Sequence, residues 1–105
     1  METVTMKTVA LHGPPPGAVL VDLRRPDEYA RGHIPGAINV PYERLKLERV
    51  RFDKSGELAF YCAHGSKSMA ACTLYERFGY KTWDLLGGYD EYKREMNKKV
   101  FDGRR

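Results

Sequence analysis

A cysteine stands where a strand-like segment changes into a helical one. The apolar residues 58–61 lead directly into Cys62, a turn containing Gly65 follows, and a helical pattern begins near Ser66. This order is typical of a strand, a loop and a helix. The first turn of a helix has unpaired N–H groups and the positive end of the helix dipole, which stabilise an anion such as a thiolate. Cys62 is therefore predicted to be a nucleophile; the alternative is that it is simply the last buried residue of a core strand.

Two side chains beside Cys62 could assist this chemistry. Lys67 would place a positive charge near a thiolate or an anionic substrate, or else it is a solvated surface lysine. His64 could donate a proton or contact a substrate, or else it is an exposed histidine with no chemical role. Both pairs of alternatives stay open at this point.

Other polar groups and the second cysteine have different expected roles. Asp22 and Arg24 come at the end of an apolar segment, where Arg24 could face a ligand pocket. His33 is expected to tie its own turn by hydrogen bonds. Cys72 falls on an apolar helix face, and its Cα should lie on the order of 10 Å from that of Cys62, too far for a disulfide. We expect two free thiols and no metal site, because the spacing of the Cys and His residues suits no common ligand set.

Length and composition restrict the class of protein. The 105 residues are enough for one domain, residues 1–105, with its own hydrophobic core. The 42% hydrophobic content includes no apolar run near the roughly 18 residues of a membrane span, and the first residues do not form a secretory signal. We therefore expect a cytoplasmic protein without membrane contact. The net charge of +4 is spread over interspersed acids and bases, which disfavours nucleic acid as a partner.

Apolar periodicity divides the chain into alternating strands and helices. Residues 1–9 could form a short edge strand, and together with the proline-rich connector that ends at Gly17 they make an N-terminal segment, residues 1–17. The alternation that follows predicts an α/β domain with a parallel sheet and helices on both faces. The tail, residues 101–105, is expected to be frayed. Strands are predicted at 18–23, 37–40, 58–62 and 81–86, and helices at 26–31, 42–50, 66–78 and 89–100.

Two turns and one helix face complete this prediction. Residues 53–56 and the pair Gly87-Gly88 are predicted to be turns, the second of them flexible. The helix after Gly65 has an apolar face that should pack on the sheet. Its predicted members are Met69, Cys72, Tyr75 and Phe78, with Ala71 and Leu74 beside them.

Four short signatures follow one another within residues 18–92. They are Asp22-Leu23-Arg24 with Glu28-Tyr29, then Gly32-His33-Ile34-Pro35-Gly36-Ala37-Ile38-Asn39-Val40-Pro41, then Tyr61-Cys62-Ala63-His64-Gly65, and finally Leu85-Leu86-Gly87-Gly88-Tyr89. A cysteine three residues before a glycine is common by itself, whereas the second signature is specific. In this combination the chain resembles the rhodanese family.

The resemblance implies a single-domain sulfurtransferase with a rhodanese-like fold and a small sheet of about five parallel strands. A small sulfur-containing anion such as thiosulfate would be the donor, a thiol or cyanide the acceptor, and no cofactor would be needed. Asp22 and Arg24 would form an internal ion pair or loop tether that supports the pocket. Matched position by position, Cys62 would carry the transferred sulfur as a persulfide, and the substrate-binding loop would consist of Ala63, His64, Gly65, Ser66, Lys67 and Ser68.

One position departs from the family pattern, in which arginine is common where Lys67 stands. An ammonium group cannot hold an oxyanion through two parallel N–H bonds, so a donor other than thiosulfate is an open alternative.

Two other functions use a similar arrangement. Cell-cycle tyrosine phosphatases resemble rhodaneses but have an arginine six residues after the cysteine, where this chain has Ser68, so a phosphatase is disfavoured. A partner-binding module, or a carrier that passes persulfide sulfur between proteins with little small-molecule turnover, stays an alternative. Transfer between proteins needs only an exposed, activated thiol.

Overall fold

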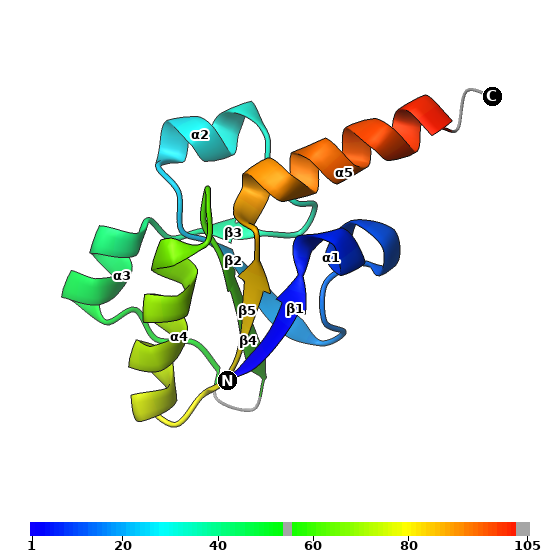
Figure 1. Ribbon diagram of the computed structural model, residues 1–105. Coiled ribbons are helices and arrows are strands. Elements are labelled where there is room, and N and C mark those ends of the chain that lie inside the picture. Colours follow the sequence, from blue (N-terminus) through cyan, green and yellow to red (C-terminus); the bar gives the residue numbers. More distant parts are fainter. Residues whose placement is uncertain (54–55, 103–105) are drawn as a thin grey trace.

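The strand-like segments form a five-stranded parallel sheet in the order β1-β5-β4-β2-β3. The computed structural model describes residues 1–53 and 56–102, and side chains up to residue 99 (Figure 1). The predicted fold class is confirmed. The strands are β1 (Glu2–Thr5), β2 (Ala18–Asp22), β3 (Ile38–Asn39), β4 (Glu57–Tyr61) and β5 (Lys81–Leu86).

Helices cover both faces of this sheet, as the alternation predicted. Two helices pack on one face and two on the other (Figure 1). Each face has its own cluster of buried side chains, and a further short helix contributes Tyr29 to the cluster on the second face. The first face carries α3 (Tyr42–Glu48) and α4 (Ser66–Arg77); the second carries α1 (Met6–His12) and α5 (Gly88–Asp102), with α2 (Pro26–Arg31) as the short helix.

The central strand β4 is buried on both sides because helices cover both faces. Leu58 and Phe60 belong to the core cluster under α3 and α4, whereas Ala59 and Tyr61 belong to the cluster under α1 and α5. All four are 0% exposed. Full burial of a large apolar side chain stabilises the fold by about 1.5–3 kcal/mol, so β4 is a rigid support for the residue that follows it, Cys62.

The chain changes direction in the sheet between β2 and β4, which are neighbours. From β2 it passes through α2 to the edge strand β3, and from β4 it passes through α4 to β5. These two helices contribute to opposite core clusters, so the connections leave the carboxyl ends of β2 and β4 in different directions. Such a divergence opens a crevice at the end of a parallel sheet, where ligands of α/β proteins bind.

Both ends of the chain differ from the prediction. A strand is present at the sheet edge, but it ends at Thr5 and Met6 begins α1. The hydroxyl of Thr5 accepts a hydrogen bond from the N–H of Thr8 and caps this helix, while Met6 and Val9, three residues apart, are buried on its inner face. At the other end, α5 continues through Asp102, so residues 101 and 102 are helical and residues 103–105 lie outside the described part.

The buried face of α4 is also shifted from the predicted one. Ser68, Cys72 and Tyr75 define it, at spacings of four and three residues, whereas Met69 is 50% exposed. Successive residues of an α-helix are rotated by about 100° around its axis. When the face that contains Ser68 is buried, the next residue, Met69, therefore lies on the side of the helix. Of the predicted turn at 53–56, Lys54 and Ser55 lie outside the described residues.

Candidate active site

Cys62 is the first residue after the central strand, directly before the loop that enters α4. Its side chain is buried, with 4% exposure, and its Sγ accepts a hydrogen bond from the N–H of Gly65 at 3.0 Å. Gly65 has φ +109°, a conformation that glycine adopts without strain, and it is the N-cap residue of α4. The predicted arrangement of thiol, glycine turn and helix N-terminus is present, and it gives the sulfur a hydrogen-bond donor that favours a negative charge.

The backbone around Cys62 is held from the other side by the start of α5. The N–H groups of Tyr89 and Asp90 donate to the carbonyls of Cys62 and Ala63 at 2.8 and 3.2 Å. A Cβ atom at Gly88 would lie 2.3 Å from the carbonyl oxygen of Ala63, so only glycine allows this approach. Gly87 forms the predicted turn, but Gly88 is not part of it, because Gly88 is the first residue of α5 and packs tightly against the loop.

A pocket of about 210 Å³ opens above Cys62 at the crevice between the ends of β2 and β4. Three connections contribute to it: the segment after β2, the start of α3, and the loop from Cys62 into α4. The sequence analysis predicted the loop after Cys62 and Arg24 as parts of the site, but it did not predict Tyr42 and its neighbours. The only sequence signal for these residues was Pro41, which ends the second of the four family-like signatures. The lining residues are Leu23, Arg24, Arg25, Glu28, Pro41, Tyr42, Glu43, Cys62, Ala63, His64, Ser66 and Lys67.

The cations in the pocket lining differ in how far they are neutralised. Arg24 is paired with Asp22, and Arg25 lies 3.0 Å from Asp27. Lys67, in the first turn of α4, has an exposed side chain and no carboxylate partner among the described residues. Its Nζ lies 6.0 Å from the centre of the Tyr42 ring. The structure thus places an uncompensated positive charge at the mouth of the pocket.

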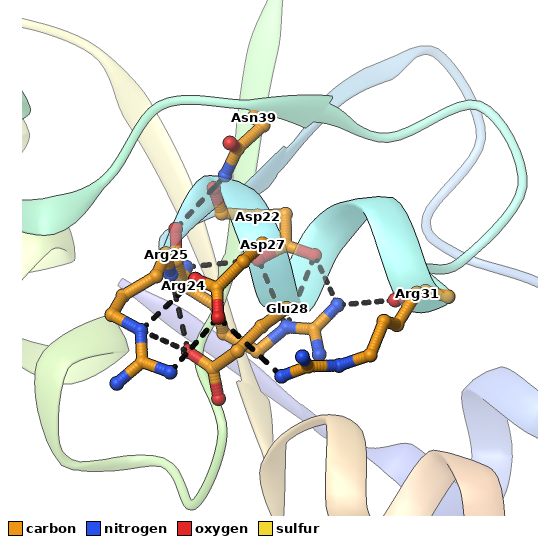
Figure 2. Close-up of polar contacts among 8 residues, drawn as sticks. Asp22, Arg24, Arg25, Asp27, Glu28, Arg31 and Asn39 are labelled. Carbon is orange, nitrogen blue, oxygen red and sulfur yellow. Dashed lines mark hydrogen bonds and ion pairs between the residues drawn. The ribbon is translucent and has the colours of Figure 1, made fainter.

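Asp22 and Arg24 form the internal ion pair that the family resemblance implied (Figure 2). Arg24 Nη2 donates to Asp22 Oδ2 at 2.8 Å and to the carbonyl of Gly32 at 2.6 Å. The hydroxyl of Tyr61 donates to the same carboxylate at 2.7 Å. Burial by itself would lower the pKa of Arg24, but the hydrogen bond and charge of Asp22 outweigh it and raise the pKa. A pair with this many hydrogen bonds holds the wall of the pocket in place.

The amide of Asn39 joins this network to β3. Its Nδ2 donates to the carbonyls of Asp22 and Arg24, each at 3.0 Å, and so fixes the chain where β2 ends (Figure 2). Burial, and then the hydrogen bond to Asp22, raise the pKa of Tyr61, which stays a neutral donor.

The two histidines near the site have different surroundings. His33 Nδ1 lies 2.8 Å from the carbonyl of Tyr29, and its ring stacks on the Tyr29 ring at 3.7 Å, so His33 supports its own turn as predicted. His64 lines the pocket, and its side chain is 80% exposed with Nδ1 at 2.9 Å from Asp90 Oδ2. This contact adds a link between the loop and α5.

Two residues on the inner face of α4 lie away from the pocket. Ser68 is 0% exposed, and its hydroxyl is turned toward β5 rather than toward a substrate. Cys72 is also 0% exposed, and burial raises the pKa of its thiol to about 12, so it is uncharged at neutral pH. Both cysteines are free. Of the two thiols, only Cys62 lines the pocket.

Other features do not compete with this site. A hollow of about 340 Å³ lies between Arg49, Arg51 and Phe78, at the opposite end of the sheet, and is lined by no cysteine or histidine. Within residues 1–53 and 56–102, no group of three His, Cys, Asp or Glu side chains is arranged to hold a metal ion. In the same part of the chain, no helix has the length and apolar character to cross a membrane.

The fold and site define a class of protein. The family model of the rhodanese-like domain matches residues 9–95, and the chain belongs to this family. It is 37% identical over 86 residues to a thiosulfate:glutathione sulfurtransferase of Saccharomyces cerevisiae, a match that covers 70% of this chain and 62% of the relative. It is 32% identical over 77 residues to a sulfurtransferase of Allochromatium vinosum, covering 72% of each chain. A rhodanese-related protein of Thermoplasma volcanium shares the fold, with a TM-score of 0.79, 24% identity, and 90% and 93% of the two chains covered.

Proposed function

We propose that this protein transfers sulfane sulfur from a donor such as thiosulfate to a thiol or cyanide, through a persulfide on Cys62. The observation that carries the proposal is the position of the Cys62 sulfur: it accepts the Gly65 N–H at a helix N-terminus, in a pocket that is also lined by Lys67, for which the described residues offer no carboxylate partner. A thiolate and a persulfide are both anions, and they benefit from this donor and from the helix dipole. The sulfurtransferases among the relatives support the same reaction type.

In the first half-reaction, the Cys62 thiolate attacks the outer sulfur of thiosulfate. A bond forms between Sγ and that sulfur while the sulfur–sulfur bond of thiosulfate breaks, and its electron pair leaves with sulfite. The product is a persulfide anion whose terminal sulfur lies further into the pocket than Sγ. Lys67 would bind the departing oxyanion, and the amide donors of the loop would stabilise the charge on sulfur.

In the second half-reaction, an acceptor thiolate attacks the terminal sulfur of the persulfide. The new persulfide forms on the acceptor, and the electron pair of the broken bond returns to Cys62 as a thiolate. The name of the yeast relative contains glutathione, which is a thiol, and this supports a thiol acceptor here. The pocket of about 210 Å³ is open to solvent through Lys67 and His64, which are exposed, so a thiol can reach the sulfur.

A phosphatase reaction finds no support in this site. The sixth residue after Cys62 is Ser68, and its hydroxyl is buried against β5 rather than directed to an oxyanion. Without a guanidinium at this position, a phosphoryl group lacks its bidentate partner.

The proposal is tested by the mass of the intact protein. After incubation with thiosulfate and removal of small molecules, we expect the wild type to gain the mass of one sulfur atom and to lose it on addition of cyanide or glutathione. Cys62→Ser should gain nothing and keep its circular dichroism spectrum, since a serine hydroxyl is not ionised at neutral pH and holds no persulfide. Cys72→Ala is the matched control and should still be loaded. Loading of Cys62→Ser, or loss of loading only in Cys72→Ala, would show that the nucleophile is misassigned.

A further inference from the structure

A carboxyl group lies buried beneath the active-site loop without a role in the steps above. Asp84 is on β5, is 0% exposed, and faces the inner side of α4. Its Oδ1 lies 2.6 Å from the hydroxyl oxygen of Ser68, while Oδ2 has no hydrogen-bond partner among the residues that the structure describes. Keeping a polar atom buried and unpaired is destabilising, so the position of Asp84 calls for a compensating role.

Ser68 connects this carboxyl group to the loop. Its Oγ also lies 2.9 Å from the carbonyl oxygen of Gly65, and the N–H of Gly65 donates to Cys62 Sγ at 3.0 Å. The hydroxyl of Ser68 is within donating distance of both the Asp84 carboxylate and the Gly65 carbonyl, so its one proton is shared between these two acceptors. One chain of contacts therefore runs from β5 through α4 to the reacting sulfur.

Gly65 is the flexible member of this chain. It has no side chain, its φ of +109° is one of several conformations open to glycine, and the first turn of α4 has no side-chain cap at this residue. A rotation of the residue would turn its N–H away from Cys62 Sγ. The hydroxyl of Ser68 holds the carbonyl side of the same residue and so restricts that rotation.

We propose that Ser68 and Asp84 are positioning residues that hold the Gly65 N–H on the sulfur of Cys62. The inference rests on the proposed function for its effect on rate, but the hydrogen bond it concerns can be followed without any reaction. Neither residue touches the substrate: Asp84 holds Ser68, Ser68 holds Gly65, and Gly65 stabilises the negative charge on sulfur.

The test uses four variants of the full chain. Ser68→Ala removes the hydroxyl, and Asp84→Leu removes the polar contact while keeping a side chain of similar size. Asp84→Asn is the conservative variant, because its amide oxygen can still accept a hydrogen bond from the hydroxyl of Ser68. Thr82→Val is the matched control: Thr82 is also 0% exposed, lies on the same side of β5, and carries a hydroxyl near Glu76 instead of the loop.

Two quantities are measured for each variant, together with its stability to urea. The first is the amide hydrogen exchange of Gly65 relative to that of Cys72 in the middle of α4; the second is the rate at which Cys62 gains sulfur from thiosulfate. We expect Ser68→Ala and Asp84→Leu to raise the relative exchange of Gly65 and to lower the loading rate, each by about tenfold. Asp84→Asn and Thr82→Val should stay within about twofold of the wild type.

The outcomes separate this inference from the proposed function. If the wild type is never loaded with sulfur, the proposed function fails, and the Gly65 exchange still decides the positioning role. If the wild type is loaded but Ser68→Ala and Asp84→Leu change exchange and rate no more than Thr82→Val, the positioning role is wrong. If Asp84→Asn is as impaired as Asp84→Leu, an acceptor at residue 84 does not hold Ser68, and the link from Asp84 is wrong.

Discussion

Lys67 is the residue at which this site differs most from the expected family pattern. It lies at the mouth of the pocket with no carboxylate partner among the described residues, in contrast to the paired Arg24 and Arg25. A single ammonium attracts an anion from any direction but does not fix its orientation, whereas a guanidinium offers two parallel N–H donors. We therefore expect Lys67 to accept a range of anionic donors and not thiosulfate alone.

Replacement of Lys67 should reveal whether it binds the donor. We expect Lys67→Ala to lower kcat/KM for thiosulfate by roughly 10- to 150-fold, the loss of one charge-assisted hydrogen bond of about 1.5–3 kcal/mol. Lys67→Arg should raise it, because the guanidinium holds the oxyanion through two bonds. Steady-state kinetics at low and moderate salt measure both effects.

Lys46 supplies the control for this series. Its Nζ lies 5.5 Å from the same Tyr42 ring and 3.6 Å from Glu43, but Lys46 does not line the pocket of Cys62. Lys46→Ala should leave kcat/KM within about twofold of the wild type. Equal kinetics for all four proteins would show that Lys67 points to solvent and that loop amides alone bind the donor.

At the scale of elements, two helices begin at the loop that contains Cys62. The N-terminus of α4 faces the sulfur through Gly65, and the N-terminus of α5 binds the backbone carbonyls of Cys62 and Ala63. The second contact depends on Gly88, where an added Cβ would overlap with the carbonyl of Ala63. The start of α5 thus supports the loop of the candidate active site.

A substitution at Gly88 should therefore damage both stability and activity. We expect Gly88→Ala to lower the free energy of unfolding by about 2–4 kcal/mol, the sum of strain at positive φ and overpacking against backbone, and to reduce sulfur loading because the loop must move. Gly79→Ala is the control, since Gly79 also has positive φ, +92°, but has nothing within 4 Å of an added Cβ. It should cost about 1 kcal/mol and leave loading intact. Urea unfolding and intact mass measure the two effects, and equal losses in both variants would contradict a special role for Gly88.

At the scale of the whole molecule, the core beneath α4 contains groups that resist ionisation. Burial raises the pKa of the Cys72 thiol and of the Tyr75 hydroxyl, each to about 12. The unfolded chain releases these protons at lower pH than the folded one. The neutral groups make their full contribution to stability below the pKa values that they have in the unfolded chain, near 9 for the thiol and 10 for the hydroxyl. This contribution is lost as the pH rises toward 12.

We expect the free energy of unfolding to fall by about 3 kcal/mol between pH 8 and pH 10.5, mostly through Cys72, since each unit of pH costs up to about 1.4 kcal/mol per group. The N-terminal ammonium acts in the same direction, because its hydrogen bond to Glu76 raises its pKa. Urea denaturation at the two pH values measures the change. Cys72→Ala should remove most of it, and an unchanged pH dependence in this variant would mean that the thiol ionises freely in the fold.

Local sequence patterns predicted most elements because the signals were strong. The apolar run before Asp22, the proline that begins α2, and the strand that leads to Cys62 each satisfy a local rule of backbone or packing. The pattern failed where a weak local preference competed with long-range packing. Met6 fits a strand or a helix equally well by its neighbours, and only the burial of Met6 and Val9 against the sheet selects the helix.

The sequence alone determined the fold class, the thiol at the end of the central strand, the glycine of its turn and the cation at Lys67, because these depend on residue type and on spacing of a few residues. Tertiary structure decided what holds them. Asp84 is 22 residues from Cys62, and Gly88 is further still, yet parallel strands bring both to the loop, one beneath α4 and one against the backbone of Ala63. Contacts between residues so far apart in the chain produce no periodic pattern in the sequence. The positions of Asp84 and Gly88 at the site are therefore seen only in the assembled sheet.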